Sequence, residues 1–151
     1  GMEYKKLFTD TAITVPVGKV SETASRLIDV TRQSLEEALK QVKPGNTIGD
    51  IGYAIQTTAE SVGFSVVRDL VGHGVGYAVH EDPAIPCYGK PGKGIVLTDY
   101  MVLAIEPMVC EIKPKIFFDT DGWTIRTQDN GLAAHLEHTI AVTKTGVRIL
   151  T

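Results

Sequence analysis

The chain has 151 residues, which predicts one domain of ordinary size or one lobe of a larger protein. Its 15 lysines and arginines against 18 aspartates and glutamates give a net charge of −3, so no basic excess favours nucleic acid or an anionic membrane as a partner. A content of 43% hydrophobic and 22% charged residues is typical of a folded domain and excludes a disordered chain. No apolar run approaches the roughly 18 residues that a membrane span needs. Two cysteines, Cys87 and Cys110, are too few for a disulfide framework, and we expect a cytoplasmic protein.

The N-terminal part of the chain predicts a short strand followed by two helices. The strand covers Leu7–Val17, and the first helix covers Ser21–Val42 with Ser21 as its N-cap. The second helix covers Thr47–Val62, with Asp50 at capping-box spacing from Thr47 and Gly63 at its end. Apolar residues at spacings of three and four define one face of each helix. They are Ala24, Leu27, Ile28, Leu35, Ala38, Leu39 and Val42 in the first helix and Ile51, Ala54, Ile55, Ala59 and Val62 in the second.

The pattern changes from helical to strand-like after the second helix. Strands are predicted at Phe64–Val67, Met101–Ile112, Trp123–Thr127, Glu137–Thr143 and Arg148–Leu150. A proline-punctuated stretch at residues 82–92 predicts a long loop. Two helices followed by several strands, without alternation of strand and helix, indicate an α+β domain over residues 1–151 in which two helices cover a largely antiparallel sheet.

Glu106 lies in an otherwise apolar run, Met101 to Val109, that predicts a buried strand. An unpaired carboxylate in such a strand would cost several kcal/mol, on the order of the penalty for burying an ion, so it needs a cation or a proton. Pro107 removes a ladder donor directly after it and predicts a bulge or a strand end that directs the Glu106 side chain. A structural ion pair with an arginine or lysine is the alternative interpretation.

Two further acids, Glu137 and Asp10, also lie in strand-like segments. Alternation places Glu137 on one face of its strand with Thr139, while His138 faces the other way. Taken alone, Glu137 fits a half-exposed strand residue better than a functional one. Aspartate is depleted from strands, so the presence of Asp10 in a strand-like segment calls for an explanation. Fraying of the chain start is the simplest one.

His73 stands between two glycines in the run Gly72–Gly76, and His80 follows seven residues later. Flanking glycines let the backbone adopt unusual conformations and approach a ligand closely. The run lacks the Gly-Lys-Ser/Thr ending of a phosphate loop, so we discard that interpretation. One histidine together with three carboxylates indicates a site for Mn, Fe, Co or Zn.

Five motifs in this order resemble the type I methionine aminopeptidases of the pita-bread fold. They are Gly72-His73-Gly74-Val75-Gly76, His80-Glu81-Asp82-Pro83, Ile105-Glu106-Pro107-Met108, Asp121-Gly122-Trp123 and Glu137-His138-Thr139. The resemblance runs from about Phe8 to the C-terminus. It implies one lobe of the pita-bread fold and metal-dependent removal of methionine from peptide N-termini.

The resemblance also implies roles for individual residues. Asp10, His73, Glu106 and Glu137 match metal ligands of the family. His80 matches a histidine that contacts the substrate peptide and helps to stabilise the tetrahedral intermediate. Trp123 matches a wall of the methionine side-chain pocket, and Val79 stands in another wall, where the family commonly has phenylalanine.

The chain departs from the family pattern in its extent. Family members are nearly twice as long and have two lobes, and this chain resembles the C-terminal lobe with the last strand of the N-terminal one. The family's first aspartate ligand would precede Asp10 by about ten residues, and this sequence has no such residue. We therefore expect a truncated chain with at most one complete site of the family's two divalent metals, and impaired activity.

The resemblance implies a peptide or nascent-chain N-terminus as the substrate. We also expect a homodimer or an N-terminal lobe as the protein partner. Two alternative functions stay open: a non-catalytic pita-bread binding protein, which has no need for intact metal ligands, and a proline-directed peptidase of the same fold.

Overall fold

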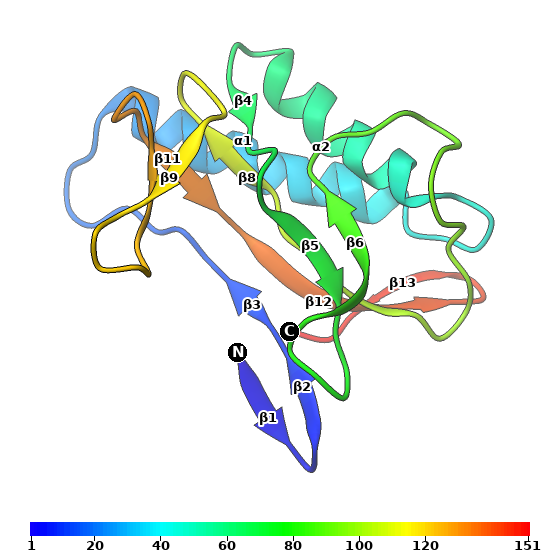
Figure 1. The fold of residues 1–151 in the computed structure, drawn as a ribbon. Helices are drawn as coiled ribbons and strands as arrows, with labels where there is room; N and C mark the ends of the chain where they lie inside the picture. The colour runs from blue at the N-terminus through cyan, green and yellow to red at the C-terminus, as the bar shows by residue number, and fades with distance from the viewer.

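The computed structural model describes residues 1–151 as two helices and thirteen strands (Figure 1). The helices, α1 (Glu22–Lys40) and α2 (Ile48–Glu60), lie side by side and pack on one side of the strands. Every strand pair is antiparallel. The α+β class and the two covering helices are therefore confirmed.

The strands form four sheets. The six-stranded sheet has the order β13 (Gly146–Ile149), β12 (Glu137–Thr143), β7 (Val102–Ile105), β5 (Val71–Gly74) and β6 (Glu81–Pro86), with β3 (Thr11–Ala12) also paired to β12. The three-stranded sheet has the order β11 (Ala133–His135), β8 (Met108–Cys110) and β4 (Ser65–Val66). Two hairpins complete the fold: β1 (Met2–Tyr4) with β2 (Leu7–Thr9), and β9 (Ile116–Phe118) with β10 (Ile125–Thr127). The β1–β2 hairpin extends away from the rest of the chain (Figure 1).

Both helices begin where their capping residues predict. The Ser21 side chain accepts a hydrogen bond of 3.1 Å from the Ala24 N–H, which satisfies one free donor of the first turn. At α2 the Asp50 carboxylate accepts from both the backbone N–H and the hydroxyl of Thr47, at 2.8 and 2.7 Å. Gly63 follows α2 with a φ of +87°, a conformation that glycine adopts without strain.

The apolar faces of the helices meet the strands in one hydrophobic core. Its fully buried side chains include Leu27 of α1, Ile51 and Ile55 of α2, and Leu103 and Ile140 of the central strands. The predicted inner face of the second helix is wrong at its last position, because Val62 lies after the helix and is 38% exposed. No helix has the length and apolar character to cross a membrane.

The strand predicted at Met101–Ile112 divides into β7 and β8 at Glu106 and Pro107. The two halves join different sheets, so the expected strand end at Pro107 is confirmed. The strand predicted over Leu7–Val17 is likewise broken at Asp10, between β2 and β3. Both acids therefore lie where a strand is interrupted, which frees their side chains from the regular alternation of a strand.

The loop predicted at residues 82–92 is wrong over its first part, where β6 forms. This strand contains Pro83 and Pro86 but lies at an edge of its sheet, where a missing N–H donor removes no ladder bond on the open side. Strands β1, β5, β9 and β11 also form without a sequence prediction; β5 has four residues and the others three each.

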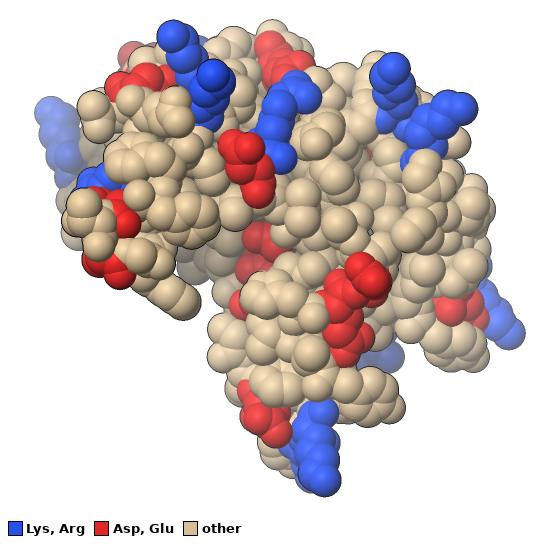
Figure 2. All heavy atoms as spheres, in the orientation of Figure 1, with Lys and Arg blue, Asp and Glu red and all other residues tan.

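Charged side chains of both signs are interspersed over the face seen in Figure 2, and uncharged residues cover most of it.

Candidate metal centre

Thr139 fixes the strand break that carries Asp10. The buried Thr139 hydroxyl accepts a hydrogen bond of 2.8 Å from the Asp10 N–H and donates one of 2.7 Å to the Asp10 carbonyl. Thr11 donates from its hydroxyl to the Glu137 carbonyl at 2.9 Å. Residues at the start of the chain are thereby held against β12, so fraying of the chain start does not account for Asp10.

His73 lies on β5, is buried, and has one ring nitrogen committed to the backbone. Its Nδ1 lies 2.9 Å from the Gly74 carbonyl oxygen, which can only accept, so Nδ1 carries the proton. Its Nε2 lies 3.4 Å from Glu106 Oε1. The flanking glycines serve strand packing, because a Cβ on Gly72 or Gly74 would collide with carbonyl oxygens of neighbouring strands.

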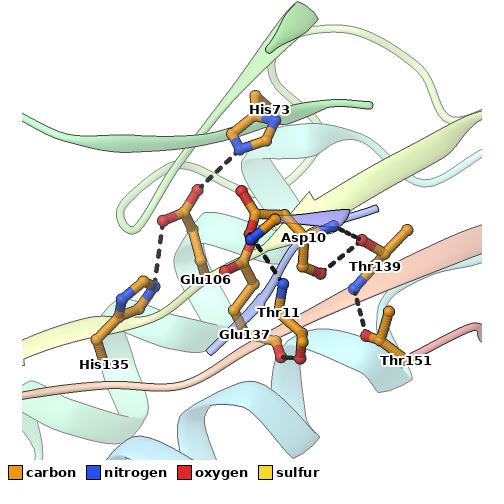
Figure 3. A network of polar contacts seen from close by, with 9 residues as sticks. Asp10, Thr11, His73, Glu106, His135, Glu137, Thr139 and Thr151 are labelled. Carbon is orange, nitrogen blue, oxygen red and sulfur yellow. Dashed lines mark hydrogen bonds and ion pairs between the residues drawn. The ribbon is translucent and has the colours of Figure 1, made fainter. Parts of the chain in front are cut away.

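Three adjacent strands bring His73 and the two glutamates together (Figure 3). His73 pairs with Ala104 of β7, Glu106 follows the end of β7, and β12 begins at Glu137. The ligand atoms of His73, Glu106 and Glu137 lie within 4.8 Å of one another. A second group within the same limit comprises Asp10, His73 and His80. The four residues predicted as ligands thus gather around His73 in two overlapping groups of three, and the second group also contains His80.

Burial and neighbouring negative charges make the ionised form of Glu137 less favourable. Burial, with the negative charges of Glu106 and Asp10, raises the pKa of Glu137 to about 7. Glu137 Oε1 is buried and accepts no hydrogen bond. No lysine or arginine forms an ion pair with Glu106 or Glu137, which rules out the structural ion pair considered as the alternative for Glu106. Asp10 Oδ1 lies 3.3 Å from the Gly1 nitrogen.

A divalent cation fits these residues. With a proton on Nδ1, His73 can present a lone pair at Nε2, and this nitrogen faces the Glu106 carboxylate. Two such acceptors at 3.4 Å need a proton or a metal ion between them. The unpaired Glu137 oxygen adds a third donor at the same point. A set of nitrogen and carboxylate-oxygen ligands suits Mn, Fe, Co or Zn.

His135 belongs to this network and was not predicted from the sequence. Its Nε2 lies 3.2 Å from Glu106 Oε2, on the opposite side of the carboxylate from His73 (Figure 3). Burial alone would lower the pKa of His135, but the nearby carboxylates, led by Glu106, raise it above its ordinary value. A signal was present in the sequence, since His135 stands two residues before Glu137 and an extended segment directs such residues to the same side.

The other predicted site residues differ in their distance from this network. His80 is exposed, and its ring centroid lies 4.3 Å from that of His73 in an edge-on arrangement. Val79 is half-buried beside His80 in the loop between β5 and β6. Trp123 lies at the turn between β9 and β10, where it is 87% exposed and takes no part in the polar network. The pocket-wall roles of Val79 and Trp123 stay predictions.

Residues 1–144 match metallopeptidase family M24. The chain belongs to this family. It is 51% identical over 142 residues to methionine aminopeptidase 1 of Bacillus subtilis strain 168, an alignment that covers 94% of this chain and 57% of that protein. It resembles the crystal structure of methionine aminopeptidase from Thermotoga maritima with a TM-score of 0.95 and 51% identity, over 97% of this chain and 59% of that one.

The M24 chain also shares its fold with a prolidase from Pyrococcus furiosus, at a TM-score of 0.73 and 23% identity, over 97% of this chain and 37% of that one. Identity at this level shows the pita-bread fold alone. The chain spans about half the length of the curated relatives it matches. The predicted family and fold are confirmed.

Proposed function

We propose that this chain provides the metal-binding part of an aminopeptidase site that removes methionine from the N-terminus of peptides. The proposal rests on one observation above the others: the lone pair of His73 and the carboxylate of Glu106 face each other at 3.4 Å, with the unpaired Glu137 oxygen beside them. The similarity of 51% to two methionine aminopeptidases supports methionine as the residue removed.

In this proposal the ligand groups have separate tasks. His73, Glu106 and Glu137 hold one divalent ion, and Asp10 joins them from the strand break that Thr139 fixes. When bound, such an ion lowers the pKa of a water molecule and polarises the scissile carbonyl. The buried Gly74 carbonyl keeps the proton of His73 on Nδ1, so that Nε2 stays available as a ligand.

His80 is the proposed catalytic residue of the chain itself. It is exposed to an incoming peptide, and its ring lies against that of His73. From this position it can donate a hydrogen bond to the peptide carbonyl oxygen as negative charge develops there. Its effect depends on a positioned substrate, because a hydrogen-bond donor without an oriented reactant contributes little.

Metal binding is the first test. Isothermal titration of the chain with Mn²⁺ or Co²⁺ should show one ion bound per chain. Glu106→Gln should abolish binding, because the amide is nearly isosteric but lacks the negative charge. Glu36→Gln, at an exposed position of α1, is the matched control and should bind as the wild type does. Equal binding by wild type and Glu106→Gln would contradict the proposed site.

Substrate choice is the second test. A Met-Ala-Ser peptide and an Ala-Pro dipeptide, each with added Mn²⁺, distinguish methionine removal from proline-directed cleavage. We propose little or no release of methionine by residues 1–151 alone and measurable release when an N-terminal lobe of the family is supplied, because the chain spans about half the length of its relatives. His80→Ala should remove the restored activity. Preferential cleavage of Ala-Pro would contradict the proposal, and metal binding without any cleavage even in the presence of the N-terminal lobe would favour a binding protein.

A protein partner is proposed for the N-terminal segment. Large apolar side chains are exposed along it, namely Met2, Tyr4, Leu7, Ile13, Val15 and Val17. An exposed apolar surface of this kind favours a second copy of the chain or the other lobe. Sedimentation velocity at tens of micromolar, on the order of the affinity of a weak interface, should show a dimer, and a clean monomer would contradict self-association.

A further inference from the structure

Beside the candidate ligands lies one buried polar atom that the proposed function leaves without a role, His135 Nε2. The His135 side chain is 38% exposed as a whole, but this nitrogen is buried and forms no hydrogen bond of regular geometry. It lies 3.2 Å from Glu106 Oε2. A buried nitrogen without a hydrogen bond is costly, and Glu106 Oε2 is the acceptor placed to relieve that cost.

His135 is not itself placed as a metal ligand. The ligand atoms that lie within 4.8 Å of one another come from His73, Glu106 and Glu137, or from Asp10, His73 and His80, and His135 belongs to neither group. The two oxygens of Glu106 therefore face two different imidazoles. Oε1 lies 3.4 Å from His73 and points into the cluster, whereas Oε2 lies 3.2 Å from His135 and points out of it.

The backbone around His135 is held from both sides. On one side its N–H donates to the Thr14 hydroxyl at 3.0 Å, and the same hydroxyl donates to the His135 carbonyl at 2.8 Å. On the other side His135 pairs with Met108, and the Leu136 N–H donates to the Pro107 carbonyl at 3.3 Å. The backbone of His135 is thus held beside the segment Pro107–Met108, which directly follows Glu106.

We propose that His135 is a positioning residue: its Nε2, 3.2 Å from Oε2 of Glu106, closes to a regular hydrogen bond when the metal binds and anchors that oxygen, so that Oε1 is presented to the metal beside His73. This inference rests on the proposed metal site. A carboxylate that is free to rotate exchanges its two oxygens, and a hydrogen bond to one oxygen orients the lone pairs of the other. Hydrogen bonds of this kind to a ligand typically change metal affinity by about 10–100-fold.

The test compares Mn²⁺ affinity in three variants of the 151-residue chain by isothermal titration. His135→Ala removes the donor and should weaken binding by about 10–100-fold. His135→Gln offers an amide N–H to the same oxygen and should restore affinity to within a few-fold of the wild type. His138→Gln is the matched control and should bind as the wild type does, because His138 faces the other side of β12 from Glu137.

Two further measurements separate positioning from a general loss of structure. Thermal unfolding without metal should give similar midpoints for His135→Ala and His135→Gln. The absorption spectrum of bound Co²⁺ reports its ligand geometry, and it should change in His135→Ala and return in His135→Gln.

Each outcome of these experiments either supports or overturns the positioning role of His135. Wild-type affinity in His135→Ala would overturn the positioning role while leaving the proposed metal site intact. Equal weakening in His135→Ala and His135→Gln, or in His138→Gln, would also overturn it, because the loss would then not depend on the donated hydrogen bond. A wild-type chain that binds no metal would instead overturn the proposed function, and this inference with it.

Discussion

Buried polar groups are hydrogen-bonded in helix α1, whereas several in the strands that carry the candidate site are not. In α1 the buried hydroxyls of Thr31 and Ser34 each donate to the carbonyl four residues earlier, at 2.7 and 2.8 Å. In the segment from His135 to His138, three buried side-chain atoms have no regular hydrogen bond. They are His135 Nε2, Glu137 Oε1 and His138 Nδ1. The same fold thus satisfies polar groups in the helical layer and leaves two of them, His135 Nε2 and Glu137 Oε1, unsatisfied beside the cluster of acids.

This difference separates stability from function. Burying unpaired acids costs free energy, and the apolar contacts of the core offset that cost. A cation that enters the cluster would satisfy the charges that the protein leaves unpaired. The helical layer should therefore determine how stable the chain is, and the β11–β12 segment should determine what it binds.

The largest effect on stability is expected in the core. Ile51→Ala removes a fully buried side chain of α2 and should lower the free energy of unfolding by about 2–5 kcal/mol. Ile95→Ala, at a position that is 51% exposed, is the control and should change it by no more than about 0.5 kcal/mol. Chemical denaturation measures both. Mn²⁺ affinity of folded Ile51→Ala should equal that of the wild type, and a large loss would show that the two regions are not separate.

Metal should stabilise the chain by binding at the candidate site in the strands. At a Mn²⁺ concentration 100 times the Kd, the free energy of unfolding should rise by about 2.7 kcal/mol, and excess EDTA should reverse the rise. Thermal unfolding with and without metal measures this change. Glu106→Gln should remove the effect of metal without unfolding the protein. A metal-induced rise that persists in Glu106→Gln would place the bound ion elsewhere.

The capping box of α2 should give a smaller, pH-dependent effect. Hydrogen bonds, first of all from the Thr47 hydroxyl, hold the pKa of Asp50 below its ordinary value of 3.8. A carboxyl whose pKa is lower in the folded state stabilises the fold at pH values above its unfolded pKa, and this contribution is lost as the pH falls through the folded pKa. Asp50→Ala should cost about 0.5–2 kcal/mol at pH 7. The difference from wild type should shrink as the pH falls below about 4, and a difference independent of pH would contradict the assignment.

The smallest effect on stability is expected from removing one negative charge from the acid cluster in the metal-free chain. Glu137→Gln removes one of three neighbouring negative charges and should raise the stability of the metal-free chain by about 0.5 kcal/mol, the scale of a partly solvated charge pair. Its metal affinity should fall at the same time. Urea unfolding in EDTA measures the first effect, with Glu36→Gln as a control that should change nothing. A metal-free variant less stable than the wild type would show that Glu137 supports the fold.

The sequence alone determined the local features of this protein. The caps at Ser21 and Thr47, the apolar faces of both helices except at Val62, and the end of a strand at Pro107 depend on residues within a few positions of one another, and the structure confirms them. Of the candidate site, the four predicted ligands and His80 do gather around His73. They were found through the order of their motifs, because single acids and histidines in strands have no local signature of metal binding.

Tertiary structure decided what depends on contacts between distant segments. The tie from Asp10 to Thr139 joins residues 129 positions apart, and no local pattern predicts it. Strand β6 forms despite two prolines because it lies at a sheet edge, a position that only the assembled sheet defines. His135 faces Glu106 because β11 pairs with β8 in a register that places it opposite Met108. Chain order and local propensity set the elements, whereas the side-chain geometry of the site follows from which strands pair and in which register.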